Sequence, residues 1–196
     1  MHPLGYKIII FMEGIKFDKK LGILDLVLSG KKTMFRLPAK NRSGKVYKTK
    51  YQVGQTLAIL QPYKDLNLSS DTLIPEINAI GLVDYIPIQA HKGWTNVTAV
   101  KPEMMKHIIE ITAVKTEAIT DITDEDCFKE GIVPVSCDDL SILDGNMPFD
   151  GYSLDGKTWL GDTPGEAFAL ISNKTIKKDI WKENKTVDVY EFKLIK

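Results

Sequence analysis

Residues 21–36 constrain the fold most, because an apolar stretch ends at a glycine and is followed at once by an extended run. Leucine, isoleucine and valine dominate residues 21–28, which predicts a mostly buried helix from Asp18 to Ser29 with Asp18 as its N-cap. Gly30 then predicts the helix end, since glycine takes the left-handed conformation without a Cβ penalty. Thr33 to Leu37 predicts a short strand. The chain is therefore expected to pass directly from a helix into a sheet.

Four polar side chains lie where this helix ends and the strand begins: Lys31, Lys32, Thr33 and Arg36. Such a cluster could bind a phosphate or carboxylate, with Arg36 offering a planar fork and Lys32 a point charge. The alternative is a helix end whose lysines complement the macrodipole. A P-loop is excluded, because Asp25 stands where its first glycine is needed and a second lysine precedes Thr33.

Composition limits the classes of protein that this chain can belong to. Its 196 residues suit one domain, 1–196, with a loop-rich, acidic insertion around 134–162. The 26 basic and 26 acidic side chains cancel, which argues against gripping nucleic acid by bulk charge. The apolar run Ile8 to Met12 is too short for a membrane span. Two cysteines without CxxC spacing and three scattered histidines predict no metal or cofactor. We therefore expect a soluble cytoplasmic protein without membrane contact.

Hydrophobic patterning and turn signals predict an α+β protein: a small mixed or antiparallel β-barrel flanked by helices. A helix should begin at Thr123 and stop at Gly131, and another should begin at Thr163-Pro164 with Glu166 completing a capping box. Loops are expected at 41–50 and 64–76. Strands are expected at 6–11, 33–37, 55–61, 77–88, 107–119 and 188–195.

Several motifs, taken in order, resemble the ASCH domain family, which is related to the PUA RNA-binding fold. Leu28 to Thr33 with Arg36 resembles its Gly-x-Lys-Thr…Arg signature, and Tyr51 to Leu57 is similar to its Tyr-x-x-Gly-Asp-x-Leu strand entry. Further similarities span Glu110 to Gly131 and Asp162 to Phe192. The group found in phages, prophages and gut bacteria is the most similar. The resemblance implies a PUA-like barrel, RNA or a small nucleotide or nucleoside as partner, and a cleft that carries Lys32 and Glu130.

Some small bacterial members hydrolyse acetylated cytidine with a lysine, a threonine and a glutamate. By position the resemblance places the lysine at Lys32 and the glutamate at Glu130, but the threonine position holds Phe35. A phenyl ring cannot act as a nucleophile. Thr33 shares a strand face with position 35, but we do not expect it to take over the role.

Three functions therefore stay open. The first is a nucleic-acid or nucleoside-binding module using Lys31, Lys32, Thr33, Arg36 and Tyr51. The second is a hydrolase on a modified nucleoside, or a ribonuclease, using Lys32 and Glu130. A third, an interaction module, draws on the acidic insertion.

The candidate site residues also have structural alternatives. Lys32 and Glu130 could form a buried ion pair, Arg36 could pair with Asp126 or Glu130, and Tyr51 could be core. If Lys32 is half-exposed, its replacement by alanine should hardly affect stability.

Overall fold

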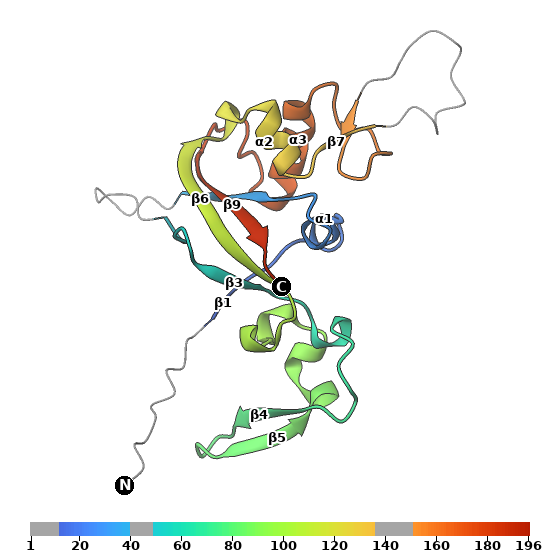
Figure 1. Cartoon of the computed structure of the whole chain (residues 1–196), viewed down its shortest axis with the longest axis vertical. Coiled ribbons are helices and arrows are strands. Elements are labelled where there is room, and N and C mark those ends of the chain that lie inside the picture. The colour runs from blue at the N-terminus through green and yellow to red at the C-terminus, as the bar shows by residue number, and fades with distance from the viewer. Residues whose placement is uncertain (1–11, 40–48, 136–150) are drawn as a thin grey trace. The chain divides into compact units, whose positions relative to one another are not determined.

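The computed structural model describes residues 12–39, 49–135 and 151–196 (Figure 1). The chain groups into two compact units. The first contains the described residues up to Lys16, residues 56–108 and Lys196, and the second contains residues 17–55 and 109–195 apart from the gaps. The strand predicted at 6–11 and most of the loop predicted at 41–50 lie outside the described residues.

The second unit contains three antiparallel strands in the order β6 (Ile108–Ala118), β9 (Thr186–Leu194) and β2 (Met34–Pro38). The ends of all three strands agree with the predicted ends to within two residues. Val114 of β6 and Phe35 of β2 both pair with Tyr190, so β9 is the central strand of the three. The β6–β9 register shifts between Ile111 and Ala113, as at a β-bulge, where the local twist of a strand increases.

The helices of the second unit are α1 (Ile23–Leu28), α2 (Asp124–Lys129) and α3 (Pro164–Thr175), with a short 3-10 helix, η6 (Ile119–Asp121). Helix α1 is shorter than predicted. Asp18 accepts a hydrogen bond from the backbone N–H of Leu21 in a preceding turn, and Gly22 has a φ of 73°, so the helix begins only after this left-handed residue. Asp18 is therefore not the N-cap.

Helices α2 and α3 begin where their capping residues predicted and pack against each other. The Thr123 hydroxyl accepts from the N–H of Asp126 at 3.2 Å, and the Thr163 hydroxyl accepts from the N–H of Glu166 at 3.2 Å. The capping box of α3 differs in one respect. The Glu166 carboxylate accepts from the N–H of Asp162, one residue before the expected donor.

The segment predicted as an irregular excursion, 134–162, contains regular structure in its described part. Strand β7 (Val133–Pro134) pairs with β8 (Tyr152–Ser153), and residues 136–150 lie outside the description. After β8, the Asp155 carboxylate accepts hydrogen bonds from the N–H groups of Thr158 and Lys157. These bonds close a tight turn.

The first unit contains a parallel pair, β1 (Glu13–Ile15) with β3 (Thr56–Ile59), and an antiparallel hairpin of β4 (Leu73–Ile77) and β5 (Val83–Pro87). The surface loop predicted at 64–76 is therefore wrong in part. Apolar residues that are far apart in sequence form a core here: Ala58, Tyr63, Leu66, Ile74, Ile88, Val100 and Met105. Five 3-10 helices connect them: η1 (Tyr63–Asp65), η2 (Ile88–Ala90), η3 (Lys92–Trp94), η4 (Val97–Ala99) and η5 (Pro102–Met104).

Together these elements confirm the predicted α+β class. No closed barrel is found among the described strands, which form open sheets.

Candidate functional site

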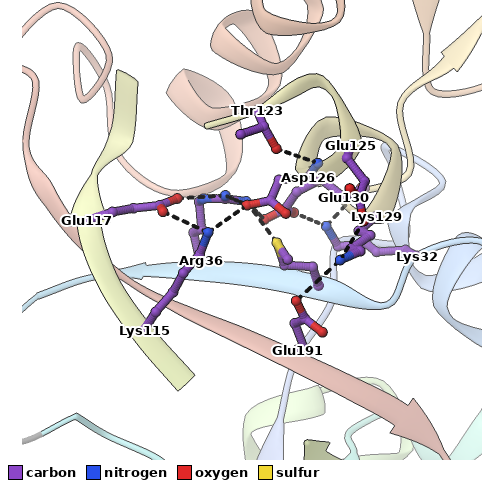
Figure 2. A network of polar contacts seen from close by, with 11 residues as sticks. Lys32, Arg36, Lys115, Glu117, Thr123, Glu125, Asp126, Lys129, Glu130 and Glu191 are labelled. Carbon is purple, nitrogen blue, oxygen red and sulfur yellow. Dashed lines mark hydrogen bonds and ion pairs between the residues drawn. The ribbon is translucent and has the colours of Figure 1, made fainter. Parts of the chain in front are cut away.

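Lys32, Arg36 and Glu130 meet in the second unit, where strand β2 lies beside the end of α2 (Figure 2). The Lys32 amine bonds the Glu130 carboxylate directly and donates a second bond to the Glu130 carbonyl at 2.9 Å. Arg36 Nη1 donates to the other Glu130 oxygen at 2.7 Å. One carboxylate thus joins both predicted cations. The expected direct contact between Lys32 and Glu130 is present.

Arg36 extends this contact into a larger network. Its Nη2 atom lies 2.8 Å from Glu117 and 3.2 Å from Asp126. Lys115 bridges the same two carboxylates at 2.8 Å each (Figure 2). Glu117 and Lys115 were not predicted as site residues. Their spacing of two places them on one face of β6, but only the fold shows that this face meets Arg36.

The network balances its own charge. Three cations, Lys32, Arg36 and Lys115, face three carboxylates, Glu117, Asp126 and Glu130. The Arg36 side chain is fully buried and that of Lys32 is 7% exposed, whereas Lys115 is 49% exposed. The premise that Lys32 is half-exposed is therefore wrong, because its amine lies inside the protein.

Burial and pairing act in opposite directions on the pKa values of Lys32, Arg36 and Asp126. Burial disfavours the charged form of Lys32 and lowers its pKa, despite attraction by Glu130. Burial would also lower the pKa of Arg36, but Glu130 and Glu117 outweigh it and the pKa is raised. Burial opposes ionisation of Asp126, yet bonding by Lys115 and the charge of Arg36 bring its pKa below the usual range. For Lys32, burial therefore outweighs the stabilisation of its charge by Glu130.

The Arg36 guanidinium has one unused donor. Its Nε is the buried side-chain nitrogen that lacks a hydrogen-bond partner within the described ranges. Its Cζ atom lies 5.3 Å from the ring centroid of Phe168, a cation–π contact from helix α3. The ring and the carboxylates fix the plane of the guanidinium.

Phe35, at the position of the family threonine, lies in an aromatic cluster. Its ring stacks on Tyr190 at 5.0 Å and contacts Phe17, Tyr51 and Phe192 at 5.7–6.2 Å. Side chains alternate along a strand, so Phe35 points away from the face of β2 that carries Met34 and Arg36. Arg36 Nη1 also contacts Met34 Sδ at 3.3 Å. A side chain at position 35 is therefore directed to the core rather than to Glu130.

Tyr51 belongs to the same cluster and is 1% exposed. Its ring packs edge-on against Phe35 and Tyr190, and the Lys50 amine lies 4.7 Å from its centroid. The structure thus places Tyr51 in the core, the alternative noted from sequence. Base stacking on it stays a prediction.

The other predicted ligand-binding residues lie at the edge of the network. Lys31 is exposed and Thr33 is half-buried. Thr33 is held by its backbone, since its N–H donates to the Lys129 carbonyl at 2.8 Å and its carbonyl accepts from Phe192. Lys129 lies next to it and pairs with Glu125 at 3.1 Å and Glu191 at 3.4 Å. Lys31 thus offers the most accessible charge of the predicted set.

No cluster of three or more His, Cys, Asp or Glu side chains suited to a metal ion occurs in the described part of the chain. Cys127 is buried, and burial raises the pKa of its thiol to about 12, so it remains protonated and unreactive at neutral pH. Within the described ranges, every helix is too short or too polar to span a bilayer.

Comparison with known proteins gives one match. No family model and no curated protein matches this chain. Among solved structures, the ASCH domain from Lactobacillus crispatus JV V101 is similar over 93% of this chain and 77% of that one. The identity is 13% and the TM-score is 0.39.

Proposed function

We propose that this protein is an ASCH-like module of PUA type that binds RNA or a small nucleotide or nucleoside, and that it is not a hydrolase. The observation that carries this proposal is the position of Phe35 in the aromatic core. The two groups that match the catalytic lysine and glutamate are present and paired, but the matching nucleophile is missing. A nucleophile at position 35 would also point away from the face of β2 that carries Arg36.

The charged network supports a role in positioning the ligand site. It ties β2 to β6 and α2 through Arg36, which fixes the backbone that presents Lys31 and Thr33. A rigid, prearranged edge lowers the entropic cost of binding. The zero net charge of the chain favours a small ligand or a single nucleotide over a long RNA footprint.

Hydrolysis of acetylated cytidine is the second candidate, and the burial of Lys32 favours it. A desolvated lysine of lowered pKa beside a carboxylate is typical of catalytic sites. The same features also describe a structural ion pair. The phage-related group, the cytoplasmic location and the single-domain organisation with an insertion around 134–162 stay predictions.

Binding is tested by calorimetry with cytidine, acetylated cytidine, other nucleotides and short RNAs. Lys31→Ala should weaken binding about 3- to 10-fold, because an exposed lysine that contacts a phosphate contributes modestly. Lys182→Ala, at another exposed lysine, is the matched control and should leave affinity unchanged. Equal affinities for wild type and both variants would show that Lys31 does not contact the ligand.

Catalysis is tested separately by following acetylated cytidine by chromatography. The wild type should show no turnover above background. Turnover that is lost in Lys32→Met would defeat the binding-module proposal and favour the hydrolase. Activity that appears only in Phe35→Thr would contradict the geometry, because position 35 faces the aromatic core rather than Glu130.

A further inference from the structure

The β4–β5 hairpin of the first unit exposes a concentration of large apolar side chains. Six of the twelve exposed large hydrophobic residues in the described part of the chain lie on it. Their exposed fractions run from 53% to 79%: Leu73, Ile77, Ile80, Leu82, Val83 and Tyr85. Single exposed apolar residues are ordinary, but a cluster of this size marks an interaction surface.

The strand register places four of these side chains, those of Leu73, Ile77, Val83 and Tyr85, on one face of the hairpin. Leu73 pairs with Pro87, Pro75 with Tyr85, and Ile77 with Val83, and all six residues of these pairs are exposed. The opposite face carries Ile74, which is fully buried in the core of the first unit. The hairpin is therefore anchored on one side and bare on the other.

At the tip of the hairpin, a hydrogen-bonded turn carries the exposed side chains of Ile80 and Leu82. The Asn78 side-chain oxygen accepts from the N–H of Ile80 at 3.2 Å and of Leu82 at 2.9 Å. Its amide nitrogen donates to Asp84 at 3.1 Å, and its backbone N–H donates to the Leu82 carbonyl. This ordering lowers the entropic cost of using Ile80 and Leu82 in an interface.

We propose that the occupant of this face is a second copy of this chain, packed hairpin against hairpin across a two-fold axis. Six large apolar side chains exposed on one hairpin form a patch of the kind that marks an interaction surface, and a stable interface needs ~800 Å² of such surface per partner. The face formed by the three cross-strand pairs carries no charged residue, so apolar contact makes it self-complementary, as a two-fold interface requires. Zero net charge on the chain removes a long-range repulsion between copies.

The edges of the hairpin argue for a closed dimer rather than an open-ended fibre. Pro75 and Pro87 have no N–H to donate to an added strand, and Lys101 donates to the Pro75 carbonyl. Face-to-face packing of two hairpins, about 10 Å apart, leaves these edges unused.

Sedimentation velocity and light scattering of the full chain from 1 to 100 μM test the proposal. We expect a species of twice the 22.0 kDa chain mass that dissociates on dilution. Ile77→Glu and Tyr85→Glu should each raise the dissociation constant at least about 100-fold, since each substitution enters a two-fold interface twice. Leu170→Glu changes an apolar residue of the second unit that is 46% exposed, and should leave the dimer unchanged.

Salt and folding controls complete the test. Sodium chloride should hardly change the association and sulfate should strengthen it, as for apolar burial. Circular dichroism should show all three variants folded, because the replaced side chains are largely exposed. A wild type that is monomeric at 100 μM would overturn the proposal, and so would a dimer that survives both hairpin substitutions.

Discussion

Removing the buried amine of Lys32 tests the ion pair at the centre of the network. Lys32→Met keeps most of the side-chain volume but removes the bond to the Glu130 carboxylate and the 2.9 Å bond to its carbonyl. Removing one partner of a buried pair costs about 3–5 kcal/mol. Arg36 still bonds Glu130 at 2.7 Å, so the loss should lie at the lower end, about 3 kcal/mol. For a chain of this size that corresponds to a melting temperature lower by about 6–12 °C.

Glu130→Gln should cost more, about 4 kcal/mol, because it leaves two buried cations, Lys32 and Arg36, without their shared carboxylate. The double variant should be less destabilised than the sum of the two, with a coupling of about 1–3 kcal/mol. Urea unfolding followed by tryptophan fluorescence measures all three, with exposed Lys182→Met as control within about 0.5 kcal/mol of wild type. Additive losses, or a Lys32→Met variant as stable as the control, would refute the pairing.

Three further perturbations follow from the same structure. The depressed pKa of Asp126 means that its contribution to stability is complete above its unfolded pKa of about 3.9 and is lost as pH falls through the folded value. In Asp126→Asn, the free energy of unfolding should therefore fall less between pH 5 and 2 than in the wild type, as measured by urea unfolding at each pH. Phe35→Thr should cost about 3 kcal/mol by leaving a cavity among the aromatic rings, visible as a lower urea midpoint. Thr163→Ala removes the N-cap of α3 and should cost about 1 kcal/mol in thermal unfolding, and an unchanged midpoint would contradict the cap.

The sequence predicted elements best where the signal is local. The starts of α2 and α3 follow from Thr123 and Thr163, whose hydroxyls bond N–H groups only three residues away. The β6 and β9 strands follow from alternation over long spans. Helix α1 was predicted too long because Asp18 resembles a cap, while Gly22 decides the start by taking a left-handed φ.

Features set by distant contacts could not be predicted in the same way. The core of the first unit joins Ala58 to Met105 through short 3-10 helices, which carry no periodic signal. The contact among three of the predicted residues is confirmed, since Lys32, Arg36 and Glu130 do meet, while their role as a site stays a prediction. The partners Lys115 and Glu117 depend on where β6 lies next to β2 and α2, which no local pattern encodes.

The internal charge balance of the network has a consequence for how the site would respond to salt. Lys32, Arg36 and Lys115 already have carboxylate counter-ions supplied by the protein itself. A phosphate reaching them would have to displace a carboxylate rather than a loosely held solvent anion. Few ions would then be released from the nucleic acid, so the logarithm of the affinity should change little with the logarithm of salt concentration. Recognition through these three cations would depend on shape and hydrogen bonding, so a titration in rising potassium chloride should show only the shallow slope, of about one at most, that the exposed Lys31 contributes.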